Sequence, residues 1–217
     1  MLRNIAMTMR DPFYHSGMRV VQDRFGGRDT ADAIHKHFVT TTLTEEQIAI
    51  IAGSRAFFVA TSWDSHVDCS MKCGKDGFVR VMAPNIIEYP EYNGNSMYRT
   101  LGNLERNPNC GLLFVDLENG GNRLRLRGQA QVFYGGKRLH AHQGACAVVR
   151  VRVVSFPNCS RYRPRFDGSD RETYDPANDV RTVPKWKTLA EVAPTLPESD
   201  PHFEALQPAK PTPGSDT

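Results

Sequence analysis

The chain has 217 residues, of which 40% are hydrophobic and 24% charged, and its formal net charge is +3 at pH 7. Such a chain can bury one good core, and the interleaving of basic with acidic residues argues against a polyanion such as nucleic acid as the partner. No apolar run approaches the roughly 20 residues of a membrane span and no signal-peptide core follows Met1, so we expect a soluble, cytoplasmic protein without a membrane partner.

The amino-terminal part, residues 1–43, is expected to form a helical arm. Apolar residues at helical spacing predict a helix over residues 30–38, and a second helix is expected over residues 18–25. Both would lie against the core.

End signals predict a third helix, over residues 45–52. Thr44 is the expected N-cap, Gln47 completes a capping box, and Gly53 is expected to end the helix. These residues lie at the start of the principal domain, which we place at residues 44–156.

Strands dominate that domain. Residues 56–62, 67–73 and 77–83 are separated by short turns, which predicts an antiparallel meander. A later hairpin and a last strand are expected at residues 111–117, 122–133 and 146–154. Six antiparallel strands of this size suggest a small barrel, so the expected fold is mainly β with flanking helices.

Between the meander and the hairpin we expect a loop over residues 84–95 and a helix over residues 97–106, capped by Ser96. Ten of the fourteen prolines fall in residues 157–217. This composition predicts an extension along the surface, without structure from about residue 193.

The five cysteines are odd in number and form no Cys-x-x-Cys, which favours reduced thiols over disulfides. Cys69 and Cys73 share one face of an expected strand about two pleats apart, a poor metal chelate without further ligands. We therefore expect no metal site.

Cationic side chains occur on separate rigid elements. Lys72 ends an expected strand and shares its face with Ser70, while Arg99 lies near the start of the helix over residues 97–106. An ammonium, a hydroxyl and a helix amino terminus together suit a phosphate group, although each alone is more often a solvated side chain or a simple cap.

The strand over residues 122–133 has arginine at positions 123, 125 and 127. A half-buried strand with a solvated face is the ordinary interpretation. Like charges about 7 Å apart repel unless an anion lies between them, so contact with a ligand is the alternative, and Arg123 is the candidate.

The order of these motifs resembles the pyridoxamine 5'-phosphate oxidase-like, FMN-binding split-barrel superfamily. The resemblance covers roughly residues 44–154 and is carried by Lys72, Gly77-Phe78-Val79, Arg99, Asn107-Pro108, Leu112-Leu113-Phe114 and residues 123–128. Tyr92-Asn93-Gly94-Asn95 and residues 157–162 resemble a less-characterised subgroup. The resemblance implies a six-stranded antiparallel split β-barrel and a homodimer that binds FMN at the subunit interface.

The resemblance also implies roles for single residues. Lys72 and Arg99 stand where the FMN phosphate is held, Thr100 replaces a lysine of that phosphate site, and Arg123 takes the place of a flavin-contacting glutamine. The implied cofactor-binding set is Asp68, Cys69, Ser70, Met71, Lys72, Met82, Ala83, Ser96, Arg99, Thr100 and Arg123. His15 and Tyr92 are candidate substrate contacts, although a lone histidine or tyrosine is more often structural.

The function implied is that of a flavin-dependent oxidoreductase acting on an unknown small molecule, with NADH or NADPH as a candidate reductant. FMN supplies the redox chemistry, so a dedicated acid or base is not required. The chain lacks counterparts of the carboxy-terminal tryptophan and arginine motifs of the true oxidase, so oxidation of pyridoxamine 5'-phosphate is not expected. Two alternatives stay open: a deazaflavin-dependent reductase of the same fold, and a flavin or haem carrier without turnover.

Overall fold

The computed structural model describes residues 13–115, 123–156, 183, 185–200 and 202–207. The chain divides into two compact units. One combines residues 1–37 with residues 175–217, and the other spans residues 38–174. The amino-terminal arm and the end of the carboxy-terminal extension therefore belong to the same unit.

The first unit is helical. Helices α1 (Ser16–Arg24) and α2 (Arg28–Phe38) confirm the two helices expected in the amino-terminal arm. The extension contributes the short helices η1 (Lys185–Thr188), η2 (Ala193–Thr195) and α6 (Phe203–Leu206). The segment from residue 193 onward, expected to lack structure, is folded in the part that the structure describes, because Val192 and Leu196 are buried.

Polar contacts hold the extension within this unit. The hydroxyl of Thr30 on α2 donates to the carbonyl oxygen of Thr195. Lys187 is buried, and its ammonium lies 2.5 Å from a carboxylate oxygen of Asp200. Asp200 also accepts a hydrogen bond from the backbone N–H of His202. The ion pair and hydrogen bonds hold the pKa of Asp200 below its usual value despite the opposing effect of burial.

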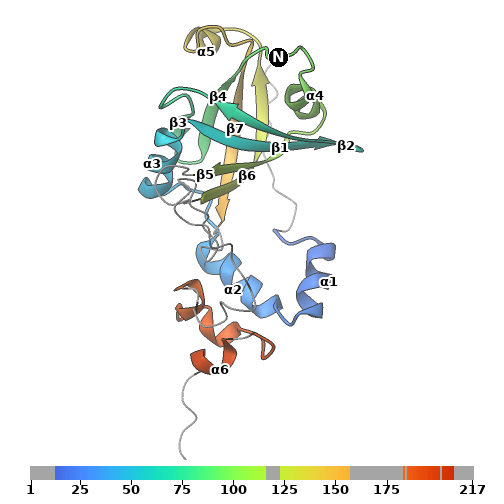
Figure 1. Cartoon of the computed structure of the whole chain (residues 1–217), viewed down its shortest axis with the longest axis vertical. Coiled ribbons are helices and arrows are strands. Elements are labelled where there is room, and N and C mark those ends of the chain that lie inside the picture. Colours follow the sequence, from blue (N-terminus) through green and yellow to red (C-terminus); the bar gives the residue numbers. More distant parts are fainter. Residues whose placement is uncertain (1–12, 116–122, 157–182, 184, 201, 208–217) are drawn as a thin grey trace, which may run out of the picture. The chain divides into compact units, whose positions relative to one another are not determined.

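The second unit is built on one antiparallel sheet with flanking helices, which confirms a mainly β fold (Figure 1). Its strands are β1 (Ala56–Trp63), β2 (His66–Cys73), β3 (Arg80–Ala83), β4 (Ile86–Glu91), β5 (Asn109–Val115), β6 (Arg123–Phe133) and β7 (Ala147–Phe156). The sheet order is β2-β1-β5-β6-β7-β4-β3. The sheet has seven strands, so the prediction of six was wrong.

The additional strand is β4, which occupies part of the segment predicted as the loop over residues 84–95. Pro90 cannot donate a ladder hydrogen bond, and Glu88 interrupts the apolar pattern, so the sequence signal for a strand is weak. In the structure Tyr89 is fully buried. Glu88 is buried as well, and its charge is compensated by Arg150 of β7, whose guanidinium lies 2.6 Å away.

The predicted three-strand meander was wrong at its second turn. β1 and β2 pair as expected, with Phe57 opposite Lys72. β3, however, pairs with β4 and not with β2. Turn residues indicate where a chain reverses, but not which strand it returns to. β2 and β3 are therefore the edges of an open sheet, and the described strands do not close into a barrel.

The sheet curves around a single core. The ring of Phe57 on β1 stacks on Phe114 of β5, with 4.9 Å between centroids. The same ring meets Tyr89 of β4 edge-on at 5.0 Å. Because β1 and β4 are not neighbours in the sheet order, this contact shows that the sheet bends back across the core.

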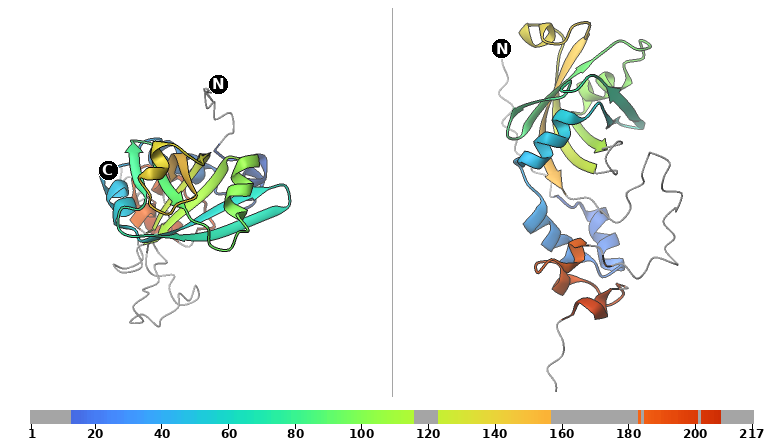
Figure 2. Two further views of the ribbon diagram at one scale, coloured as in Figure 1. Left: turned by 90° about the horizontal axis from the view of Figure 1, so that it is seen from above. Right: turned by 60° about the vertical axis from the view of Figure 1, so that its left-hand side comes forward.

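Two longer helices flank the sheet. α3 (Glu45–Gly53) has the predicted capping box between Thr44 and Gln47. α4 (Arg99–Arg106) packs against β1 and β2 and begins two residues later than predicted (Figure 2). A short α5 (Lys137–His140) precedes β7. None of the helices described here has the length and apolar character needed to cross a bilayer.

Candidate functional site

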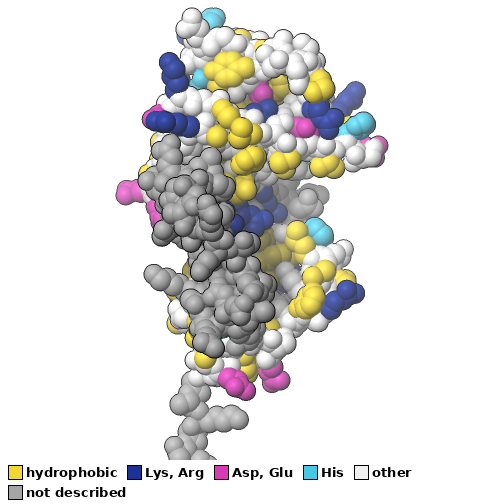
Figure 3. Space-filling view, viewed as in Figure 1, with side chains coloured by type: hydrophobic (Ala, Val, Ile, Leu, Met, Phe, Trp, Pro, Cys, Tyr) yellow, Lys and Arg dark blue, Asp and Glu magenta, His cyan; other side chains and the backbone are white. Residues whose placement is uncertain are grey.

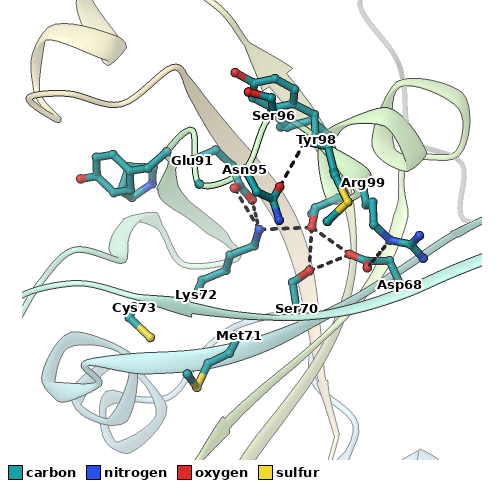
Figure 4. Close-up of a pocket in the computed structure, with 16 residues that line it drawn as sticks. Asp68, Ser70, Met71, Lys72, Cys73, Glu91, Asn95, Ser96, Tyr98 and Arg99 are labelled. Carbon is teal, nitrogen blue, oxygen red and sulfur yellow. Dashed lines mark hydrogen bonds and ion pairs between the residues drawn. The ribbon is translucent and has the colours of Figure 1, made fainter.

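A pocket of about 410 Å³ opens between β2, the end of β4 and the start of α4 (Figure 4). Its volume lies within the range of small-molecule sites, roughly 300–1,000 Å³. The lining residues are Asp68, Ser70, Met71, Lys72, Cys73, Pro90, Glu91, Tyr92, Gly94, Asn95, Ser96, Met97, Tyr98, Arg99, Thr100 and Leu101.

A polar row on β2 forms one wall. Side chains alternate between the two faces of a strand, so Asp68, Ser70 and Lys72 point to one side, while Met71 and Cys73 point to the other (Figure 4). The row continues the face that carries Phe57 on β1, but at the sheet edge it lies beneath α4 instead of entering the core. Because β2 is an edge strand and α4 covers this row, the row forms a partly buried polar wall of the pocket.

Asp68 gathers three donors at the far end of this row. Its Oδ1 accepts a hydrogen bond from Nε of Arg99 at 3.0 Å, and its Oδ2 accepts from the hydroxyls of Ser70 at 2.7 Å and Thr100 at 3.1 Å. Arg99 also donates to the backbone oxygen of Val67 at 2.9 Å. Desolvation opposes ionisation of Asp68, but these hydrogen bonds prevail and lower its pKa. Asp68 is therefore an anion that orients Arg99 and both hydroxyls.

Lys72 is held by a second carboxylate. Its Nζ lies 2.7 Å from Oε1 of Glu91 without hydrogen-bond geometry, and it donates to Oε2 at 2.9 Å. It also donates to the hydroxyl of Thr100 at 3.1 Å. The side chains of Lys72 and Glu91 are only 15% and 7% exposed. Burial raises the pKa of Glu91, although the hydrogen bond from Lys72 opposes this rise.

The formal charges of the lining cancel. Two cations, Lys72 and Arg99, face two carboxylates, Asp68 and Glu91. The candidate phosphate-binding groups are thus present, but each cation already has an anionic partner within the protein.

The loop between β4 and α4 shapes the mouth of the pocket. Asn93 accepts a hydrogen bond from the backbone N–H of Ser96 at 3.0 Å, and Asn95 accepts one from that of Met97 at 3.1 Å. Ser96 and Tyr98 have φ angles of 61° and 46°, in the left-handed region that residues other than glycine rarely adopt. Side-chain hydrogen bonds to the loop backbone help to hold this conformation.

This conformation determines how α4 begins. Tyr98 is the N-cap residue and makes no side-chain cap, so the prediction that Ser96 caps the helix was wrong. The first turn of α4 lies in the pocket wall, where uncapped backbone N–H groups and the helix dipole favour an anion. Large apolar or aromatic side chains complete the exposed part of the lining: Met71, Tyr92, Met97 and Tyr98.

Most of the residues predicted from the sequence meet in this pocket. They are Asp68, Ser70, Met71, Lys72, Tyr92, Ser96, Arg99 and Thr100. Four others lie outside its lining: Cys69 on the opposite face of β2, Met82 and Ala83 on edge strand β3, and Arg123 at the start of β6. His15 belongs to the other unit, where its ring accepts a hydrogen bond from the backbone N–H of Met18 and caps α1.

Sequence reasoning missed Glu91, Asn95 and Tyr98. Glu91 closes β4, which lies in the segment predicted as a loop, so the sequence does not predict its burial beside Lys72. The Asn-Gly-Asn sequence did indicate a turn, because asparagine side chains often bond to backbone groups two residues on. No local signal identifies which lysine a glutamate will meet across a fold.

No protein-family model and no curated protein matches the chain. Among solved structures, the chain is similar to a provisionally named pyridoxamine 5'-phosphate oxidase from Lactobacillus delbrueckii. The two sequences are 19% identical, the match covers 55% of this chain and 96% of the Lactobacillus chain, and the TM-score is 0.43. It is also similar to HupZ of Group A Streptococcus (19% identity, 54% and 99% coverage, TM-score 0.40). A third is an FAD-binding protein from Mycobacterium smegmatis (15% identity, 54% and 96% coverage, TM-score 0.37).

The first of these structures bears the name of the oxidase family that the sequence motifs resemble. Identities and scores of this size transfer no residue role.

Proposed function

We propose that this pocket binds the phosphate end of FMN and that the protein is a flavin-dependent oxidoreductase acting on a small molecule. One observation carries the proposal. Lys72, Arg99 and the uncapped first turn of α4 converge on one pocket, together with the hydroxyls of Ser70 and Thr100. Ammonium, guanidinium, hydroxyl and backbone N–H donors are the groups that bind phosphate in proteins.

The donor set fits a phosphate monoester in kind and in number. Thr100 occupies the centre, since its hydroxyl lies within hydrogen-bond distance of Lys72, Asp68 and Ser70. Arg99 lines the pocket, and more than half of its side chain is exposed, so Asp68 and Val67 do not fully enclose it. The two carboxylates, Asp68 and Glu91, do not suit a dianion.

The apolar lining supports a ring system beside the phosphate. Met71, Tyr92, Met97 and Tyr98 expose thioether and aromatic surface at the pocket. Such side chains provide flat contact surfaces for an aromatic ring. Bound flavin would supply hydride or electron transfer, while the residues of this chain bind and orient it and keep water from one face.

We also propose a homodimer that completes the flavin site. The outer face of β1 and β2 exposes Phe58, Val67 and Met71, and Phe58 lies opposite Met71 in the strand register. Figure 3 shows hydrophobic side chains across the side of the sheet that is turned to the viewer. Because Met71 belongs both to this face and to the pocket lining, a partner on this face would reach the ring end of the ligand.

The absorbance spectrum of the purified protein, and of the protein after reconstitution with FMN, tests this function. We expect flavin bands near those of free FMN, quenched or enhanced fluorescence on titration, and bleaching of the bands by NADH or NADPH. A deazaflavin spectrum would mean that the cofactor is a deazaflavin and not FMN, while the proposed fold would stand. A Soret band would indicate haem. Bound FMN that no nicotinamide nucleotide reduces would favour a carrier. Absence of binding to both FMN and riboflavin would refute the proposal.

A further inference from the structure

Glu91 already binds the ammonium of Lys72, the group that an anionic ligand would need to contact. Its Oε2 accepts the hydrogen bond from Lys72 at 2.9 Å, and Lys72 is the more enclosed of the two lining cations. A phosphate that binds Lys72 directly therefore meets a carboxylate already in contact with the same ammonium.

The geometry of Glu91 makes it a poorly satisfied anion. The residue is 6% exposed, and both of its carboxylate oxygens rely on the ammonium of Lys72: Oε2 accepts its hydrogen bond, while Oε1 lies 2.7 Å from Nζ but has no hydrogen bond among the described residues. A buried carboxylate normally has hydrogen bonds to both oxygens, because a charged oxygen without one is costly to bury. Asp68, with three donors on its two oxygens, shows the satisfied arrangement in the same pocket.

The titratable groups around Glu91 come from several elements. Lys72 and Asp68 face it from β2, and Arg99 of α4 is held by Asp68. Tyr89 precedes it on β4 with a buried hydroxyl, and the thiol of Cys146 donates to its backbone oxygen. Among the described residues Lys72 is the cation that contacts the Glu91 carboxylate and opposes the effect of burial, so the protonation state of Glu91 responds to what else Lys72 binds.

We infer that Glu91 is the internal competitor of the ligand phosphate, and that an anionic ligand binds at Lys72 together with a proton taken up by Glu91. This inference rests on the proposed function, since it concerns the phosphate end of the same pocket. The proton neutralises the carboxylate that the phosphate displaces from Lys72. Glu91 thereby sets both the strength and the pH dependence of discrimination between FMN and its phosphate-free analogue riboflavin.

The sign of the pH dependence follows from the two states of the pocket. Burial already raises the pKa of Glu91 in the free protein. A bound phosphate takes its partner Lys72 away and adds negative charge, which raises this pKa further. At a pH between the pKa of Glu91 in the free protein and its pKa in the complex, binding takes up a proton, so the affinity for the phosphate increases as the pH falls. Below the pKa of the free protein Glu91 is protonated in both states, and its contribution no longer depends on pH.

The experiment compares wild type with Glu91→Gln, titrated with FMN and with riboflavin in phosphate-free buffers from about pH 6 to about pH 8. The FMN phosphate has its own pKa of about 6, and the comparison between the two proteins removes its effect. Glu105→Gln is the matched control, because Glu105 is on α4 but outside the pocket lining and bonds to Tyr134. Calorimetry of wild type in two buffers of different ionisation enthalpy counts the protons taken up.

We expect Glu91→Gln to bind FMN roughly tenfold more tightly than wild type near neutral pH, and riboflavin no more tightly. Relative to this variant, wild type should gain affinity for FMN as the pH falls, by at most about tenfold per pH unit for one coupled proton. The control should follow wild type.

Equal affinity and equal pH dependence in wild type and Glu91→Gln, or weaker FMN binding by the variant, overturns the inference while the FMN function stands. If the variant does not fold, zero proton uptake by wild type overturns it instead. Binding of FMN by neither protein at any pH refutes the proposed function and, with it, this inference.

Discussion

The ammonium of Lys72 on β2 lies 2.7 Å from the carboxylate of Glu91 on β4, although four strands separate β2 from β4 in the sheet order. The sheet curves far enough to bring one edge strand against the end of the strand next to the other edge. We call this contact the seam. It fastens an open sheet at the point where the candidate pocket begins.

Lys72→Met tests the contribution of the seam lysine to ligand binding. A charge-assisted hydrogen bond to phosphate contributes about 1.5–3 kcal/mol, so we expect FMN affinity to fall roughly ten- to hundredfold while riboflavin binding changes little. Flavin fluorescence titration measures both. Arg106→Ala, at the exposed end of α4 and outside the pocket, removes a positive charge as a control. Unchanged FMN affinity in Lys72→Met would exclude a phosphate contact at this position.

Asp68→Asn tests the carboxylate that organises the other end of the polar row. The structure lowers the pKa of Asp68, so its charge stabilises the fold above the unfolded-state pKa, and this stability is lost as the pH falls through the folded pKa. Near neutral pH the variant should be less stable by about 1–3 kcal/mol, because Arg99, Ser70 and Thr100 lose a charged acceptor.

Urea unfolding at several pH values measures this difference. It should begin to shrink below the unfolded-state pKa of about 3.9, where the unfolded chain protonates this carboxyl, and it should disappear below the lower folded-state pKa. A difference that stays constant down to the acid-unfolding range would show that Asp68 is not the stabilising anion.

Phe58→Glu tests the dimer. The outer face of β1 and β2 is apolar and exposed, and a buried carboxylate at its centre would be unpaired, so we expect a monomer in light scattering at micromolar concentration. Gln131→Glu, an exposed change of the same charge on β6, should remain dimeric. A monomeric wild type that holds FMN would contradict the proposed assembly.

Gly128→Ala tests the close packing of β6 against β7. A Cβ atom at Gly128 would overlap the carbonyl oxygen of Arg152 on β7, whereas one at Gly135 would meet nothing within 4 Å. Crowding of this kind costs about 1–3 kcal/mol, so the melting temperature should drop clearly for Gly128→Ala and barely for Gly135→Ala. Equal melting temperatures of Gly128→Ala and Gly135→Ala would mean that β6 and β7 can move apart at Gly128 without a loss of stability.

Local signals predicted those parts of the fold that local interactions determine. The capping box of Thr44 and Gln47 predicted α3, and the spacing of short turns predicted β1 and β2 to within a residue at each end. β4 was missed because its burial depends on compensation of Glu88 by Arg150, which comes from another strand. Its edge-strand pairing with β3 likewise depends on tertiary contacts.

The site divides in the same way. Lys72 and Ser70 were found because a strand places alternate residues on one face, and Arg99 because it lies near a helix start. The left-handed backbone at Tyr98 makes α4 begin at Arg99, two residues later than predicted. No residue type in the loop indicates this backbone conformation. Glu91 could not be paired with Lys72 without knowing that the sheet curves.

The seam also links the evolutionary fates of two positions nineteen residues apart. Replacement of Lys72 alone would leave the buried carboxylate of Glu91 without a cation. Replacement of Glu91 alone would leave the buried ammonium of Lys72 with only a ligand to neutralise it. Neutral replacements should therefore arise at both positions together, or at position 91 first in a lineage where the cofactor is always present. A homologous chain with an uncharged residue at position 91 and lysine at position 72 should gain more stability from its bound ligand than this chain does.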